Sequence, residues 1–225
     1  MKKTAVLLAI ALIIFCLAFL GGCQDKGDDR IVADERIITV SFETSGGTAI
    51  EEMYLFKGNR LSKVDLEIPT KAKAYFVEWY TDNALQQIFA YDKLYGDITL
   101  YAKWVECTET LELSLKIDDE AIINKQDIQE ARVAIKPNQN GRFEYSLEIV
   151  IKDSECERIK NIINANTWEN LEIYFGTEFV RSLTIGSVTE IISVPIITRD
   201  FTQSDYLSLA EYAVKINNWL AGGAL

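Results

Sequence analysis

The residue types that usually carry catalysis are thinly represented in this chain. Its 225 residues include no histidine, four cysteines and 34 Asp and Glu residues. Histidine is the commonest general base, a frequent zinc ligand and the usual activator of serine or cysteine nucleophiles, so its absence excludes those mechanisms. Carboxylate pairs and Ser/Lys chemistry remain open. No spacing singles out such a pair, and no P-loop, G-x-S-x-G or dinucleotide fingerprint is present, so we predict no catalytic residue, cofactor or metal.

The densest acidic cluster in the second half of the chain is Asp118, Asp119 and Glu120. Three adjacent carboxylates could bind a metal ion or exchange protons. They fall between two segments in which polar and apolar residues alternate, where a hairpin turn is expected. We therefore interpret them as a solvated turn.

The first 22 residues have the features of a secretory signal. A basic start is followed by an uncharged apolar run from Ala5 to Leu20, which is shorter than the roughly 20 residues that cross a bilayer as a helix. The run ends in LGGC, Leu20 to Cys23, which resembles the bacterial lipobox. That resemblance implies cleavage between Gly22 and Cys23 and attachment of palmitate-type acyl chains to Cys23. A plain signal peptide with a chance cysteine and an uncleaved anchor are the alternatives.

Residues 23–35 are polar and acidic and contain glycine, as expected of a flexible tether. Acyl chains on Cys23 would hold the protein at the extracytoplasmic face of the cell membrane. Cleavage removes Lys2 and Lys3, so the net charge of −11 becomes −11 minus 2, about −13. A chain this acidic is repelled by nucleic acid, which is therefore not an expected partner.

Two cysteines remain once Cys16 leaves with the signal and Cys23 carries lipid. These are Cys107 and Cys156. Outside the cell they could form a disulfide. The alternative is a pair of small, half-buried thiols, and the sequence leaves both open.

Residues 36–105 consist of short alternating segments separated by turns. Ile38, Val40 and Phe42 alternate with polar residues, as in a strand with one buried face. The pieces VSFETSGG, IPTKAKAYFVEWYTDNAL and DITLYAKW resemble, in order and spacing, the Listeria–Bacteroides repeat, also called the internalin-type B-repeat. The resemblance implies a small β-grasp-like unit of bacterial surface proteins, closed by the strand DITLYAKW.

Two tryptophans of this unit, Trp79 and Trp104, could be a ligand platform or part of a core. A unit this small buries little surface, and large aromatic side chains supply much of it, so we interpret both as core. The family usually has glycine at the positions of Ala74 and Glu78. The local backbone is therefore expected to differ there.

Residues 108–225 alternate between strand-like and helix-like patterns. Two segments, LELSLKI and RFEYSLEIVI, place apolar residues at every second position, which predicts half-buried antiparallel strands. Ser154 and Glu157 form an S-x-x-E pattern that predicts a helix start. A last helix is predicted from Thr202, with Asp205 three residues on. Together these predict an α+β sandwich, an antiparallel sheet with two helices.

This second part resembles the head subdomain of the large extracytoplasmic loop of SecD. The resemblance rests on INKQDIQEARV, YSLEIVIKDSECERIKNI, LEIYFGTEFVRSLTIGSVTEIISVPI and the closing DFTQSDYLSLAEYAVKINNWLAGGAL. SecD has transmembrane helices that use proton flow, and no segment after the signal here is long and apolar enough to be one. A head without that motor could still contact other polypeptides.

Three functions follow as hypotheses. The first is a non-catalytic, membrane-anchored binding protein whose partner is a protein or a cell-envelope polymer. The second is an extracytoplasmic accessory to protein export or folding, which an apolar groove on the second part would favour. The third is an enzyme of unrecognised mechanism. We expect binding along the strands after Leu171, although that face could instead pack against the first part.

Overall fold

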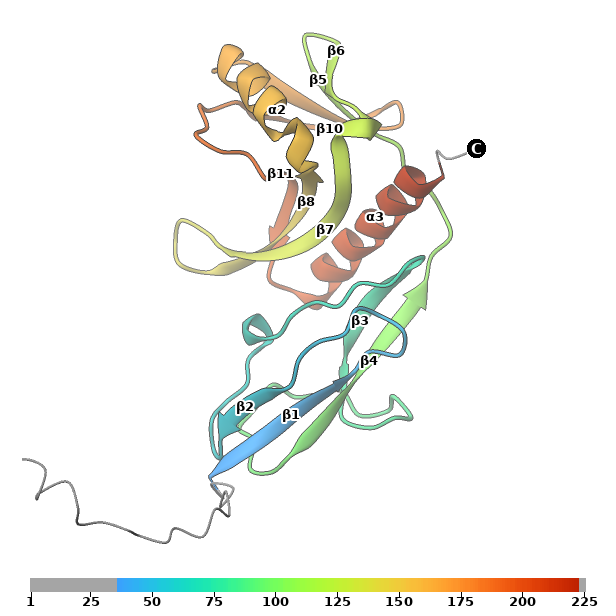
Figure 1. Cartoon of the computed structure of the whole chain (residues 1–225), viewed down its shortest axis with the longest axis vertical. Coiled ribbons are helices and arrows are strands. Elements are labelled where there is room, and N and C mark those ends of the chain that lie inside the picture. Colours follow the sequence, from blue (N-terminus) through green and yellow to red (C-terminus); the bar gives the residue numbers. More distant parts are fainter. Residues whose placement is uncertain (1–35, 223–225) are drawn as a thin grey trace, which may run out of the picture. The chain divides into compact units, whose positions relative to one another are not determined.

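The computed structural model describes residues 36–222. The predicted signal, tether and lipidation site at Cys23 lie outside the described residues. Within them, the chain forms a four-stranded sheet followed by two further sheets and two α-helices (Figure 1). The predicted α+β class is therefore confirmed.

The first sheet contains four strands and one short 3-10 turn. These are β1 (Ile37–Glu43), β2 (Met53–Phe56), η1 (Lys63–Asp65), β3 (Ala74–Tyr80) and β4 (Ile98–Glu106). The strand order is β2-β1-β4-β3. β1 and β4 run parallel, while the other pairs are antiparallel. The segment DITLYAKW, last in the unit's sequence, thus supplies an inner strand of the sheet.

Aromatic side chains fill the core of the first sheet. Trp79 is 1% exposed, and its ring centroid lies 5.2 Å from that of Phe42 and 5.1 Å from that of Phe76. Its interpretation as a core residue is confirmed.

Trp104 closes the rim of the same core. It is half-buried and packs edge-on against Phe76, and its Nε1 donates to the backbone oxygen of Thr44 at 2.9 Å. A Cβ on Gly47 would lie 2.4 Å from the Trp104 ring, so glycine allows this close approach. The core interpretation is confirmed for Trp104 as well.

The second part folds as two antiparallel sheets. One has the order β10-β9-β5-β6 and the other β11-β8-β7. Their strands are β5 (Leu113–Ile117), β6 (Glu120–Ile123), β7 (Ile128–Pro137), β8 (Phe143–Ile151), β9 (Asn170–Phe175), β10 (Glu178–Thr184) and β11 (Ser193–Asp200). The 3-10 turn η2 (Lys125–Asp127) separates β6 from β7. The chain therefore passes from one sheet to the other there, a division that strand alternation alone did not predict.

The acidic cluster lies in the hairpin between β5 and β6. Asp118 and Asp119 have φ angles of 48° and 66°, as in the two-residue turns that match the twist of paired strands. Both side chains are exposed. The interpretation as a solvated turn is confirmed.

The helix α3 (Gln203–Ala221) begins as predicted. The Thr202 side chain accepts a hydrogen bond from the Asp205 backbone N–H and caps the first turn. The buried face of the helix is Tyr206, Leu209, Ala210, Ala213 and Ile216. This face covers the sheet β11-β8-β7, where the ring of Tyr206 lies 5.2 Å from that of Tyr145.

The helix α2 (Asp153–Ala165) begins differently from the prediction. Its N-cap is Lys152, which makes no side-chain cap, and the Ser154 hydroxyl contacts Glu155 instead. The predicted capping box of Ser154 and Glu157 is therefore wrong. Asp153 and Glu155 lie in the first turn, where negative charge interacts favourably with the helix dipole.

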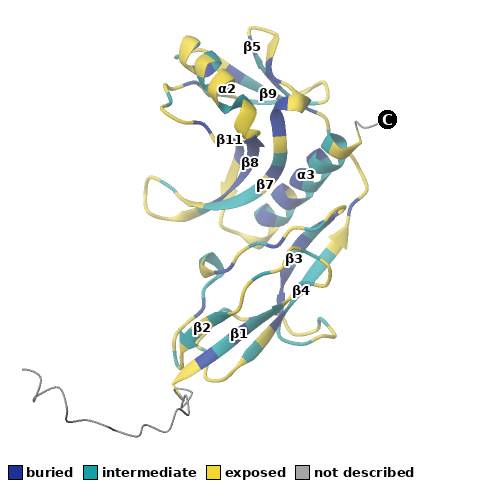
Figure 2. Cartoon of the chain, viewed as in Figure 1, coloured by how far each residue is buried: buried dark blue, intermediate teal, exposed yellow. Residues whose placement is uncertain are grey.

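The helix α3 also contacts the first sheet through β3 (Figures 1 and 2). The Tyr206 ring packs edge-on against Phe76 at 6.4 Å. Gln203 Nε2 donates to the backbone oxygen of Val77 at 2.7 Å. The division of the chain into units 36–105 and 108–225 stays a prediction, because these contacts alone do not show whether either unit folds by itself.

Candidate functional site

A buried carboxylate, Glu78, lies where α3 meets β3. Its Oε2 forms an ion pair with Lys63 Nζ at 2.6 Å, and its Oε1 accepts from the Tyr91 hydroxyl. Lys63 Nζ also donates to Gln203 Oε1 at 2.6 Å. The cluster Lys63–Glu78–Tyr91–Gln203, called here the seam cluster, therefore joins the first sheet to α3.

Tyrosine hydroxyls surround the seam cluster and titrate only at high pH. Burial raises the pKa of Tyr91, and the charge of Glu78 and the hydrogen bond to it raise that pKa further. Burial and the same carboxylate raise the pKa of Tyr145. The pKa of Tyr206 is also raised, mainly by burial. These phenols stay protonated near neutral pH and can donate hydrogen bonds.

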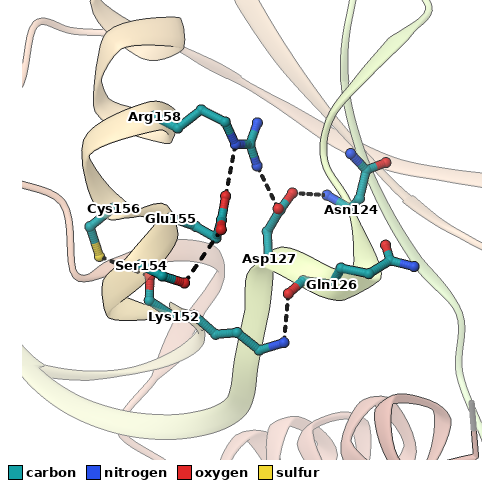
Figure 3. Close-up of polar contacts among 8 residues, drawn as sticks. All are labelled: Asn124, Gln126, Asp127, Lys152, Ser154, Glu155, Cys156 and Arg158. Carbon is teal, nitrogen blue, oxygen red and sulfur yellow. Dashed lines mark hydrogen bonds and ion pairs between the residues drawn. The ribbon is translucent and has the colours of Figure 1, made fainter. Parts of the chain in front are cut away.

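A second buried carboxylate, Asp127, fastens α2 to η2 (Figure 3). Its Oδ1 contacts Arg158 Nη2 at 2.5 Å, and its Oδ2 accepts from the Asn124 backbone N–H at 2.7 Å. Arg158 Nε also contacts Glu155 at 2.9 Å. Both oxygens of Asp127 are therefore satisfied within the second part of the chain.

A third buried carboxylate, Glu148, lies on β8 and is 1% exposed. Lys136 forms an ion pair with its Oε1. Arg132 Nη2 lies 3.6 Å from its Oε2, and Ser193 Oγ donates to the same oxygen at 3.2 Å. These three carboxylates lie in separate clusters, each with at least one cation of its own.

An apolar groove of about 490 Å³ lies between the end of β10 and the start of β11. Its walls are mainly aliphatic, among them Leu171, Leu183, Ile185, Ile191 and Ile192. The adjacent strand β10 is at the edge of its sheet, so one side of its backbone faces away from the hydrogen-bonded ladder. The exposed Phe179, 52% accessible, lies on the same strand.

Two residues predicted as sites from the sequence, Cys107 and Cys156, make no hydrogen bond in the described part of the chain with the three buried carboxylates or their cations. Cys107 is buried at the end of β4, and Cys156 is half-buried on α2. Both are free thiols in the structure. Cys23, Gly22 and the predicted cleavage lie outside the described residues. Within residues 36–222, no group of three or more His, Cys, Asp and Glu side chains gathers as metal ligands would.

Sequence patterns did not reveal Glu78, Asp127 or Glu148 as buried residues. Glu148 lies on the face of β8 opposite to Leu147 and Ile149, and both faces of this strand are covered. The one available signal was at Glu78, which occupies a position where the repeat family usually has glycine. The backbone there has a β-bulge between Phe76 and Glu78.

No helix of the described part is long and apolar enough to span a membrane. One relative is a protein of Evansella cellulosilytica named as a Gly-rich membrane protein, 36% identical over 69 residues. The match covers 29% of this chain and 8% of that protein, so this chain corresponds to only a small fraction of its relative.

A solved structure of SecDF, described as a membrane component that enhances protein export, is also similar. The similarity covers 43% of this chain and 42% of that one, with 11% identity and a TM-score of 0.32. Residues 39–103 match the family model of the Listeria-Bacteroides repeat domain, which confirms the repeat predicted for residues 36–105.

Proposed function

We propose that this chain is a lipid-anchored, extracytoplasmic binding protein that holds an extended segment of another polypeptide and catalyses no reaction. The observation that carries the proposal is the apolar groove beside the edge strand β10. The proposed anchor is Cys23.

An edge strand with a neighbouring apolar groove suits an extended polypeptide. Backbone groups on the outer side of β10 can pair with an added strand, and aliphatic pockets can take its alternate side chains. Charged residues Glu178 and Arg181 and the bulge near Val180 lie on the same strand. Such features limit uncontrolled edge pairing, so binding is expected to be selective.

The buried carboxylates support a non-catalytic role. Each is paired with a lysine or arginine of the chain, which is the arrangement of structural ion pairs. General acid–base catalysis needs a group that can exchange protons with a substrate near the working pH. A buried carboxylate that is held by its own cation suits that role poorly.

An accessory role in export or folding is a second candidate, and the same groove favours it. The two functions differ in the range of partners. Both hold an extended segment, but a surface adaptor prefers particular partners, whereas an export or folding accessory accepts many unfolded chains.

The binding proposal is tested with α-lactalbumin in two states, native and permanently unfolded by reduction and carboxymethylation. Unfolded protein should bind the full chain, and Ile192→Asp should weaken binding about tenfold or more, because it places a charge in the groove. Ile88→Asp is the matched control, since Ile88 is similarly exposed, 60% against 57%, and lies in the first part. Equal affinities for the two variants, or no binding by the wild-type chain, would contradict the proposal.

The anchor is tested by cell fractionation. Cys23→Ser should release the protein to the medium or leave an unprocessed precursor, because the acyl chains have no sulfur to join. A variant that stays in the membrane at mature size would exclude lipidation at Cys23.

A further inference from the structure

A pocket of about 500 Å³ lies among the segment 70–73, the segment 125–130 and the end of α3. Four lysines contribute to its wall: Lys71, Lys73, Lys125 and Lys152. The only carboxylate among its lining residues is Glu130. The pocket is therefore positively charged in a chain whose net charge is −11.

None of these four lysines forms an ion pair with a carboxylate in the part of the chain that the structure describes. Lys63, Lys136, Lys160 and Lys215 all form ion pairs. By contrast, Lys71 Nζ donates to the Ser45 backbone oxygen at 2.8 Å, and Lys152 Nζ donates to that of Gln126 at 2.6 Å. A neutral carbonyl accepts one hydrogen bond and leaves the full charge and the other N–H donors available.

Lys125 is used in part by the protein itself. Its Nζ donates to the Trp219 backbone oxygen and lies 4.9 Å from the centre of the Trp219 ring. A cation there offsets the negative end of the α3 dipole, which would otherwise repel an anion. Lys71 Nζ is engaged in a similar way, by the Ser45 oxygen and by the Trp104 ring at 5.6 Å, so Lys73 and Lys152 are the two best placed to act on a ligand.

We infer that this pocket binds a ligand bearing several phosphate groups. Lysine ammonium groups are compact point charges that bind phosphate oxygens without the fixed planar geometry of arginine. The pocket volume falls within the range of small-ligand sites.

An acidic peptide fits this pocket less well than a phosphate compound. Peptides that add to a sheet need free backbone groups on an edge strand. In β7, the Ala131 backbone N–H and oxygen are both taken by the Asn217 side chain, at 2.7 and 2.8 Å. Next to the pocket, β7 therefore has no free backbone group at Ala131 with which an added peptide could pair.

This site is separate from the apolar groove of the proposed function. The groove is lined by residues of the segments 163–171 and 183–195, and the two sets of lining residues do not overlap. Ile192→Asp should leave anion binding unchanged, so failure of one proposal does not imply failure of the other.

The test is calorimetric titration of the full chain in nonionic detergent with inorganic tripolyphosphate. Binding should weaken as salt is added. Lys73→Gln/Lys152→Gln should lower the affinity roughly tenfold or more. Lys57→Gln/Lys93→Gln changes the net charge equally, but neither residue lines the pocket, so its affinity should match the wild type. Thermal melts establish that both variants are folded.

Four outcomes would overturn the inference. The first is no binding of tripolyphosphate by the wild-type chain. The second is equal loss in the two double variants, which would indicate a general charge effect. The third is binding of citrate or tetraglutamate as tight as that of tripolyphosphate, which would assign the pocket to carboxylates. Retained affinity in Lys73→Gln/Lys152→Gln would also exclude this pocket as the site.

Discussion

Glu78 and Asp127 are both carboxylates with little solvent exposure, and each forms an ion pair with one basic side chain. Their surroundings differ in origin. The partners of the Asp127 carboxylate, Arg158 and Asn124, both belong to the second part, so the site fastens α2 to η2 within that part. The seam cluster instead combines Lys63 and Tyr91 of the first part with Gln203 of α3.

The same chemical arrangement therefore acts at two levels of structure. A buried ion pair contributes little net stability when intact, but the loss of one partner is costly. At Asp127, the free-energy cost of losing a partner stabilises the packing of α2 against η2. At Glu78 it enforces the contact between the repeat and the second part, so a change there should alter how the two parts unfold together.

The largest expected effect comes from neutralising these carboxylates. Glu78→Gln should cost about 3–5 kcal/mol of unfolding free energy, because Lys63 loses its counter-ion in a half-buried position. Asp127→Asn should cost less, roughly 1–3 kcal/mol, since Arg158 is 43% exposed and keeps Glu155.

The two variants should also differ in cooperativity. Urea unfolding of Glu78→Gln is expected to give transitions that no longer coincide when followed by tryptophan fluorescence and by far-UV circular dichroism. Asp127→Asn should keep coincident transitions. Coincident transitions in both variants would show that the seam cluster does not couple the two parts.

Alkaline pH offers a second way to separate the two sites. Burial and Glu78 raise the pKa of Tyr91 in the folded state, while in the unfolded chain it stays near 10. Above about pH 10 the unfolded state therefore loses a proton that the folded state keeps, and stability falls as pH rises. The slope for one such tyrosine is about 1.4 kcal/mol per pH unit.

Tyr91→Phe should remove this contribution, so its stability should fall less steeply between pH 10 and 11 than that of the wild type. Glu78→Gln should also reduce the slope, but by less than Tyr91→Phe, because burial is the largest cause of the raised tyrosine pKa and remains after the charge of Glu78 is removed. Asp127→Asn should not, since no effect of Asp127 on these tyrosines is found. Urea unfolding at several pH values measures all four slopes.

Local patterns in the sequence were sufficient for much of the fold but for none of the buried ion pairs. Alternation predicted β1, β5 and β8, and the aromatic pieces identified the repeat. The hairpin at Asp118 followed from its position between two strands. Each of these inferences depends on residues close together in the chain, where spacing determines which side chains share a face.

The seam cluster depends on residues far apart in sequence. Lys63 and Gln203 are 140 positions apart, and no period connects them. The bulge before Glu78 also breaks strict alternation, so that Glu78, Trp79 and Tyr80 are all buried. Burial of a carboxylate by a second part of the chain is a tertiary effect that a local pattern does not contain.

The smallest expected effect concerns the helices that bring partners to the two carboxylates. Thr202 caps α3, its Oγ1 accepting from the Asp205 backbone N–H at 3.2 Å, so Thr202→Ala should cost about 1 kcal/mol. Ser154 is exposed and caps nothing, so Ser154→Ala should change the free energy of unfolding by no more than about 0.5 kcal/mol.

The first turn of α3 carries Gln203 into the seam cluster. Fraying that turn should therefore cost less when Glu78→Gln has already loosened the seam, whereas the Asp127→Asn background should leave the cost unchanged. Urea unfolding of the single and double variants gives both coupling energies, and equal coupling in the two backgrounds would show that the α3 cap acts on the helix alone.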